Sequence, residues 1–179
     1  MTGQGLSLKP FPTSGALPDI KITAVVGRLS DTLLVRYELL GPLADLLIPA
    51  PADRPSRRDR LWEETCFELF IRPKDADHYW EINLSPAGYW NVYHFGSYRQ
   101  GMREESAWTT LPFRVTIEQN ALRLSLELEL YKITLIDQDV RIAVSAVIKP
   151  IRGSITYWAL AHPAPQPDFH HRDSFIVEL

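Results

Sequence analysis

The sequence predicts an all-β fold, namely an antiparallel β-sandwich of the jelly-roll-like kind with little helix. Three observations support this class. Short segments alternate between apolar and polar residues, turns that contain Pro or Gly separate these segments, and no segment has the periodicity of a long helix. About nine or ten strands are expected. Strand patterns alone do not separate a jelly roll from an immunoglobulin-like sandwich.

The expected strands follow an irregular lead-in over residues 1–18, which is rich in Gly and Pro. Residues 42–60 are expected to form a loop with one helical turn at 43–47. The segment 140–148 is almost continuously apolar, which is typical of a central strand that is covered on both faces. The full set of expected strands covers residues 20–26, 32–39, 66–71, 79–85, 90–95, 113–118, 121–128, 140–148, 154–160 and 174–179.

The composition is that of one ordinary globular domain, which we expect to span residues 1–179. Hydrophobic residues make up 45% of the chain, charged residues make up 23%, and the net charge is −3. A slightly acidic chain of this kind is not typical of a nucleic-acid-binding protein. The sequence shows neither a signal peptide nor an apolar run that could span a bilayer, so we expect a cytoplasmic protein without a membrane partner.

Two features that resemble reactive or binding groups have simpler structural explanations. Cys66 is the only cysteine, so it cannot form an internal disulfide, and its place within a strand predicts a small core residue. Four arginines between residues 54 and 60 form the main basic cluster. Aspartates interrupt this cluster, so we predict a solvated loop rather than a phosphate or membrane site.

The segment 62–71 places an aromatic ring close to a carboxylate in an apolar strand. Trp62 precedes the strand 66–71, and Glu68 lies six residues after Trp62. Alternation puts Glu68 on the face opposite to Phe67 and Leu69. A carboxylate in such a strand faces water, finds a partner or meets a polar ligand, because burial without a partner is costly. Glu68 is therefore a candidate site residue, with Trp62 at the rim.

The next two strands are predicted to form a hairpin with one apolar face and one polar face. Trp80 and Ile82 share the apolar face, Glu81 and Asn83 share the other, and a Pro-Ala-Gly turn follows. Aromatic rings cover the C–H faces of sugars, while acids and amides bind sugar hydroxyl groups. This mixture of side chains favours a saccharide or another polyhydroxylated ligand.

These segments resemble the DOMON-like group, which is related to family 9 carbohydrate-binding modules. The matching segments are 61–68, 79–86, 90–93 and the tail from 167 to 175. The resemblance implies a non-catalytic β-sandwich that binds a saccharide between two tryptophans, with polar side chains on its hydroxyl groups. It implies a small-molecule or saccharide partner. We expect no cofactor for this chain.

Carried over residue by residue, the resemblance implies a set of binding side chains. Trp62 resembles the first tryptophan plate, and Glu68 resembles the acid that follows it. Glu81 and Asn83 resemble the polar pair on the neighbouring strand, although the first of these residues is basic in the relatives. The sugar that this chain would recognise is therefore expected to differ from theirs.

The second plate and the remaining ligand contacts come from other segments. Trp158 on a late strand is the best candidate for the second plate, and Trp108 is the next. Arg99 and His94 are further candidates for contacts with hydroxyl groups. The predicted ligand-binding set is thus Trp62, Glu68, Glu81, Asn83, His94, Arg99 and Trp158.

Other functions remain open from the sequence. Glu68 and Glu81 on adjacent strands are also a candidate acid pair of a glycoside hydrolase, in which the two carboxyl groups stand about 5 to 10 Å apart. Other DOMON relatives bind haem through methionine and histidine, so Met102 with a tail histidine is the corresponding candidate pair. A protein-interaction module would instead expose an apolar patch.

The histidines of the tail are also candidate metal ligands. His170 and His171 are adjacent, and on a strand they would point in opposite directions, so spacing alone is weak support. We therefore predict no metal site. The tail residues concerned are His162, Asp168, His170, His171 and Asp173.

Overall fold

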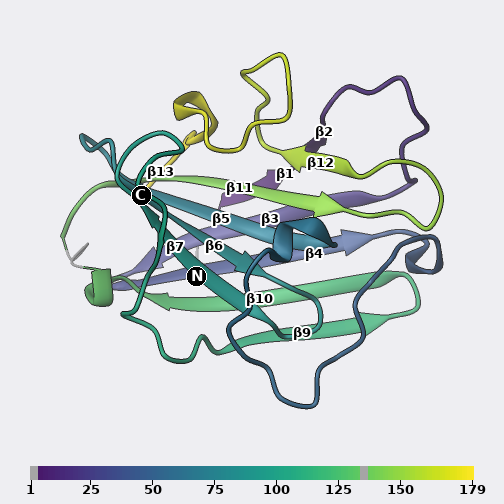
Figure 1. Cartoon of the computed structure of the whole chain (residues 1–179), viewed down its shortest axis with the longest axis horizontal. Coiled ribbons are helices and arrows are strands. Elements are labelled where there is room, and N and C mark those ends of the chain that lie inside the picture. The colour runs from purple at the N-terminus through teal and green to yellow at the C-terminus, as the bar shows by residue number, and fades with distance from the viewer. Residues whose placement is uncertain (1–3, 134–136) are drawn as a thin grey trace.

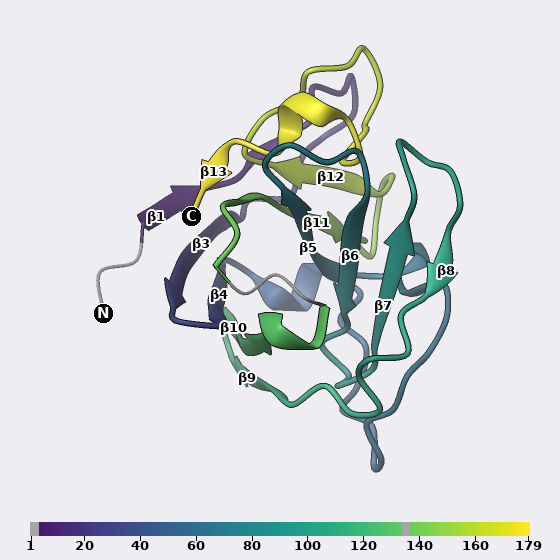
Figure 2. The same ribbon diagram turned by 90° about the vertical axis from the view of Figure 1, so that its left-hand side faces the viewer.

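The computed structural model describes residues 4–133 and 137–179, and it contains two antiparallel sheets (Figure 1). In the view turned by 90°, the two sheets form two layers, with β4 and β10 on one side and β6 and β7 on the other (Figure 2). The first sheet has the order β1-β3-β4-β10-β9. Its strands are β1 (Gln4–Ser7), β3 (Lys21–Leu29), β4 (Thr32–Leu40), β9 (Phe113–Glu118) and β10 (Ala121–Glu129).

The second sheet carries the candidate site and has the order β2-β12-β11-β5-β6-β7-β8, with β13 paired to β11. Short 3-10 helices η1 (Leu43–Asp45), η2 (Leu61–Glu63), η3 (Leu130–Ile133) and η4 (Arg172–Ser174) complete the described elements. The strands are β2 (Lys9–Pro10), β5 (Cys66–Pro73), β6 (Tyr79–Leu84), β7 (Trp90–Phe95), β8 (Arg103–Glu104), β11 (Val140–Ile148), β12 (Thr156–Ala159) and β13 (Val177–Glu178).

The structure confirms the predicted fold class, and it also confirms the helical turn near residue 43 as η1. β11 is flanked by β5 and β12 and is buried along most of its length, as its apolar sequence predicted. The short strands β1, β2 and β8 were not predicted. They lie at sheet edges, where backbone pairing needs no apolar pattern. The predicted final strand 174–179 is shorter, because its first residue belongs to η4.

The apolar faces of the two sheets meet in one core. β4 buries alternate side chains such as Leu33 and Val35, and β5 buries Phe67 and Leu69 from the opposite layer. Burial of each such side chain stabilises the fold by about 1.5–3 kcal/mol. Tyr37 of β4 crosses this core, and its hydroxyl group donates a hydrogen bond of 2.6 Å to the backbone carbonyl oxygen of Glu68. The two layers are thus joined directly beneath one of the candidate acids.

A second apolar cluster covers the outer face of the second sheet. Phe70, Tyr79, Tyr93 and Phe95 project from β5, β6 and β7, and Phe175 of the C-terminal segment packs over them. β5 and β6 are consequently buried on both faces. The hairpin face that the sequence predicted to be polar is therefore a polar patch set within an aromatic surface.

The arginine cluster before η2 is only partly the solvated loop that the sequence predicted. Arg57 lies over the Trp90 ring, with its Cζ atom 4.4 Å from the ring centroid. Its guanidinium group donates to Asn91 Oδ1 at 2.5 Å and to the backbone oxygens of Glu105 and Trp108 at 2.8 and 2.7 Å. Arg57 therefore ties two loops to β7, a role that spacing in the sequence does not reveal.

Replacing Arg57 by alanine should lower the free energy of unfolding by about 2–4 kcal/mol. The substitution removes three charge-assisted hydrogen bonds and leaves the amide and carbonyl acceptors without this donor. Urea unfolding followed by tryptophan fluorescence measures the loss. Arg54→Ala, a change at an exposed position of the same loop, should alter stability by less than about 0.5 kcal/mol. Equal effects of the two substitutions would contradict this role of Arg57.

Candidate functional site

A pocket of about 390 Å³ lies on the outer face of the second sheet. Its floor comes from β5, β6 and β11, and its walls come from η2, the β7–β8 loop, β12 and the C-terminal segment. Most of the lining residues are apolar, and the others include two glutamates, one arginine and one histidine. The lining residues are Trp62, Glu68, Glu81, Phe95, Arg99, Met102, Val147, Tyr157, Pro167, Phe169 and His170.

The two acids of the floor are diagonal neighbours on one face of the sheet. Glu68 of β5 pairs with Asn83, and Phe70 pairs with Glu81, so the two glutamates are offset by two residues along adjacent antiparallel strands. Diagonal neighbours of this kind lie about 7–8 Å apart between Cα atoms, which is within reach of long side chains. Only 3% of Glu68 and 4% of Glu81 are exposed. Two acids are therefore held in a space from which water is largely excluded.

This burial changes the protonation of both acids. Burial raises the pKa of Glu81 to about 7. Burial, followed by the charge of Glu81, raises the pKa of Glu68 well above its ordinary value. Like charges in a low-dielectric site disfavour double ionisation, so we expect the pair to keep one proton near neutral pH. The pair then offers a carboxylate acceptor and a carboxyl donor side by side.

Neighbouring side chains orient the acids. The Asn83 amide donates to Glu81 Oε1 at 2.7 Å, and the Ser145 hydroxyl group of β11 donates to Glu68 Oε2 at 3.3 Å. Asn83 is fully buried and does not line the pocket. Asn83 lies on the same face of β6 as Glu81, as predicted, and its amide group binds Glu81.

His170 connects the acids to the wall of the pocket. Its Nδ1 atom lies 2.8 Å from the Tyr79 hydroxyl oxygen, which in turn accepts the backbone N–H of Arg99 at 3.2 Å. Burial and then the charge of Arg99 lower the pKa of His170 to about 4, so the ring is neutral at pH 7. The other ring nitrogen, Nε2, lies 3.7 Å from Glu81 Oε2.

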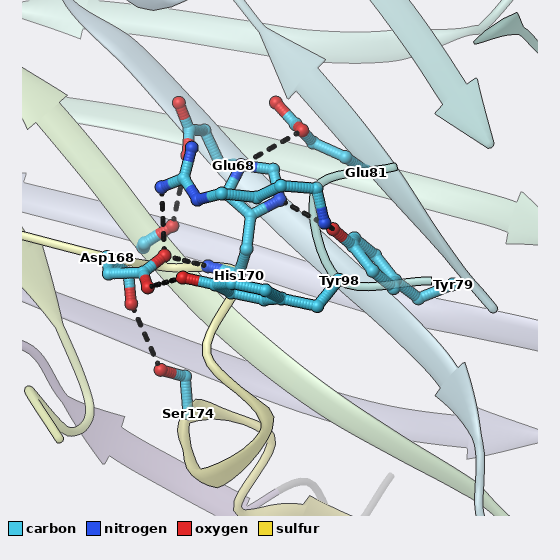
Figure 3. A network of polar contacts seen from close by, with 9 residues as sticks. Glu68, Tyr79, Glu81, Tyr98, Asp168, His170 and Ser174 are labelled. Carbon is cyan, nitrogen blue, oxygen red and sulfur yellow. Dashed lines mark hydrogen bonds and ion pairs between the residues drawn. The ribbon is translucent and has the colours of Figure 1, made fainter. Parts of the chain in front are cut away.

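Asp168 joins the C-terminal segment to the β7–β8 loop (Figure 3). One oxygen accepts from the Tyr98 hydroxyl group at 2.6 Å, and the other accepts from Arg99 at 2.9 Å and from the His170 backbone N–H at 3.1 Å. Burial opposes the charged form of Asp168, but these donors outweigh it and lower its pKa. Figure 3 shows this cluster beside His170, with Ser174 on its other side. The two loops thereby close one wall of the pocket.

Trp62 forms another wall, and two local contacts fix it there. Arg60 has the left-handed φ of 60° immediately before η2, and its backbone N–H donates to Asp59 Oδ1 at 2.8 Å. The same Asp59 oxygen accepts from the Tyr93 hydroxyl group at 2.6 Å. The Trp62 ring then packs edge-on against Tyr93, with centroids 5.7 Å apart. It stays partly exposed and lines the pocket.

The structure brings together four of the seven predicted ligand-binding residues in the lining of one pocket, namely Trp62, Glu68, Glu81 and Arg99. These residues come from four different segments of the chain. Their roles toward a ligand remain predictions.

The predicted positions of Trp158 and His94 are wrong. Trp158 pairs with Ala146, whose face points into the core, and the indole is buried there with its N–H donated to Thr156. His94 pairs with Trp80 and packs against that ring, again away from the acids. Because strand neighbours point to opposite faces, a residue that shares a face with Trp80 cannot reach Glu81. Trp108, the second candidate plate, is also buried in the core.

Several pocket residues escaped prediction as ligand contacts. Tyr157, beside Trp158, lines the pocket, whereas Trp158 does not. Phe95 of β7 lines the pocket one residue after His94. Phe169 and His170 come from the tail. The tail was part of the resemblance, but the sequence did not indicate that it lies over the second sheet. Alternation along β7 was a usable signal for Phe95, because it shares the face of Tyr93.

The metal and haem hypotheses can be compared with this geometry. Among the described residues, no three His, Cys, Asp or Glu side chains converge to hold a metal ion. Met102 and His170 do line the same pocket. Nδ1 of His170 lies 2.8 Å from the Tyr79 hydroxyl oxygen, and Nε2 lies 3.7 Å from Glu81 Oε2. Haem binding by this pair stays a prediction. In the described ranges, no helix combines the length and apolar character that crossing a membrane requires.

Fold and pocket together define an antiparallel β-sandwich with an acid-floored, aromatic-walled pocket on one sheet. Among solved structures, the chain is similar to a proposed carbohydrate-binding protein from Bacteroides uniformis, with a TM-score of 0.73 and 11% identity over 97% of this chain and 84% of that one. At this identity the likeness establishes a shared fold. No protein-family model and no curated protein matches the sequence.

Weaker similarities are found to a family 9 carbohydrate-binding module from Caldicellulosiruptor kristjanssonii. The structure of that module with glucose has a TM-score of 0.48 at 10% identity, over 80% of this chain and 68% of that one. Its structure with cellotriose has a TM-score of 0.47 at 9% identity, over 86% and 72% of the two chains. The DOMON part of the resemblance remains a prediction.

Proposed function

We propose that this protein is a non-catalytic binding protein whose pocket holds one saccharide unit or a similarly polyhydroxylated small molecule. The observation that carries the proposal is the buried acid pair Glu68 and Glu81 at the base of a predominantly apolar pocket. A carboxylate and a carboxyl group together accept from and donate to vicinal hydroxyl groups. An apolar ligand would leave both acids without such partners, at a cost in free energy.

The walls support the same class of ligand. Trp62, Tyr157 and Phe169 present aromatic surface, which suits the C–H faces of a pyranose ring. Arg99 adds a charged donor, and the neutral His170 ring adds a further polar group to the lining. The pocket volume of about 390 Å³ falls within the usual range for small-molecule sites. The fold shared with a proposed carbohydrate-binding protein makes saccharides the first ligands to test.

Isothermal titration calorimetry against a panel of neutral mono- and oligosaccharides tests the proposal. We expect at least one member to bind with a one-to-one stoichiometry and to raise the melting temperature of the wild-type protein. The variant Glu68→Ala should lose that heat, because it removes half of the acid pair. A panel that gives neither heat nor a thermal shift with the wild-type protein would reject saccharide binding.

A hydrolase is the second candidate, because glycoside hydrolases also use two neighbouring carboxyl groups of which one is kept protonated by a raised pKa. This alternative predicts slow turnover of chromogenic glycosides that Glu68→Gln and Glu81→Gln abolish. Turnover that persists unchanged in both variants would exclude these acids as its source. Binding of intact saccharides without turnover favours the non-catalytic function.

A further inference from the structure

A second pocket of about 580 Å³ adjoins the first one, and His170 lines both. Its lining is more basic than that of the first pocket. Arg72 of β5 and Arg172 of η4 face it, together with Ser97, Gln100 and His171. Nothing in the proposed saccharide function uses these side chains.

Arg72 is an unusual residue in this position. Only 2% of it is exposed, and it lies on a sheet face with its Cζ atom 5.3 Å from the centroid of the Phe175 ring. Its Nη1 atom donates to the carbonyl oxygen of Ala76 at 3.2 Å. Its Nε and Nη2 atoms are buried without a hydrogen-bond partner in the described part of the chain. Buried charged donors without acceptors are costly in free energy. An acceptor for Nε and Nη2 would remove this cost.

Neighbouring positive charges add electrostatic repulsion at Arg72. Arg141 of β11 stands directly opposite Arg72 in the sheet, and Arg172 approaches from η4. Burial, then Arg172 and Arg141, lower the pKa of Arg72, although an arginine keeps its charge at any physiological pH. Two nearby carboxylates pair with other arginines: Asp77 lies 3.1 Å from Arg172, and Glu178 lies 2.6 Å from Arg141. Asp77 and Asp173 act on Arg72 through their charge, and neither forms a hydrogen bond with its Nε or Nη2 atom.

We propose that the second pocket binds a small oxyanion of the phosphate type. Arg72 Nε and Nη2 form the pair of parallel donors that suits two oxygens of such an anion. Arg172 would supply a second guanidinium group, and the Ser97 hydroxyl and Gln100 amide groups would supply neutral donors at the rim. Asp77 also lines this pocket, and its carboxylate accepts a hydrogen bond of 3.1 Å from Arg172, which holds that guanidinium group in place.

The oxyanion has two chemical sources. It is either free in solution or the ester group of a phosphorylated sugar whose ring occupies the first pocket. A phosphorylated sugar fits this arrangement because His170 lines both pockets. The sugar ring would contact His170 from the first pocket, and the phosphate group would contact it from the second. The site itself does not depend on the saccharide proposal.

Calorimetric titration with inorganic phosphate, at constant ionic strength and without sugar, tests the site. We expect phosphate to bind the wild-type protein and to stabilise it against heat. Arg172→Gln, a change at a side chain that is 59% exposed, should weaken this binding by about tenfold or more. Arg36→Gln, which removes an exposed arginine on the other sheet, is the matched control and should leave it unchanged. Arg72→Gln should abolish binding if that variant folds.

Absence of phosphate binding to the wild-type protein would overturn the proposal, as would equal binding by Arg172→Gln and Arg36→Gln. Titration with glucose, glucose 6-phosphate and inorganic phosphate then separates the sources. An ester that binds more tightly than both other compounds identifies a sugar phosphate, whereas an ester that equals inorganic phosphate identifies a free anion. Phosphate binding without any saccharide binding would leave this site intact and reject the function proposed for the first pocket.

Discussion

Replacing Trp62 by alanine should weaken saccharide binding by at least tenfold. The indole borders the pocket and is partly exposed, so a ring that covers it removes the remaining apolar surface from water, at about 25 cal/mol per Å². A loss of 1.4 kcal/mol already corresponds to a factor of ten in the dissociation constant. Calorimetry with the best saccharide from the panel measures the change.

Two further variants isolate the contribution of the ring surface. Trp62→Phe retains an aromatic face and should recover most of the affinity. Tyr131→Ala removes an exposed aromatic side chain outside the pocket and should have no effect. If Trp62→Ala binds the saccharide as tightly as the wild-type protein does, the ligand lies elsewhere and the assigned pocket is wrong.

Replacing Glu81 by glutamine should stabilise the protein at pH 8 relative to wild type, and much less at pH 4. The pKa of Glu81 is about 7 in the folded protein and 4.5 in a free side chain. Between these values the folded state holds a proton that the unfolded state has lost, so stability falls as pH rises. The full difference corresponds to about 3 kcal/mol. The glutamine side chain avoids this loss because it does not ionise, and its oxygen can still accept from Asn83.

His170 changes stability in the opposite direction, so the comparison must be made between variants. Its pKa is about 4 when folded against 6.5 in a free side chain. The unfolded state therefore holds more protons in that interval, and stability rises with pH there. In the wild-type protein the two effects partly cancel. The difference between Glu81→Gln and wild type, measured by urea unfolding at several pH values, reports the titration of Glu81 together with its effect on the pKa of Glu68.

Glu127→Gln provides the matched control, because Glu127 is exposed on the first sheet. Its effect on stability should be small and independent of pH. A Glu81→Gln variant whose advantage over wild type does not grow between pH 4 and pH 8 would show that Glu81 is ionised and satisfied in the folded protein. The raised pKa would then be wrong.

The acids and the hairpin that carries them were predictable because strand geometry is periodic. Glu68 and Glu81 alternate with apolar residues, so their common face follows from the sequence once the strands are adjacent. The same rule assigns His94 to the face of Trp90 and Val92, and applying it strictly would have excluded that histidine. For Tyr157 and Trp158 the alternation rule gives no answer. Both residues are aromatic, so the sequence does not indicate which of the two faces the core.

The sequence by itself determined the β-sandwich, the bounds of most strands and the face on which each acid lies, because these depend on alternation between near neighbours. Only the tertiary structure decided that the tail returns over the second sheet, where Asp168 meets Arg99 and His170 meets Tyr79. These contacts join residues about 70 to 90 positions apart, and no local pattern encodes which loop covers which face. The pocket exists because long-range packing closes its walls around acids that the strands had already placed.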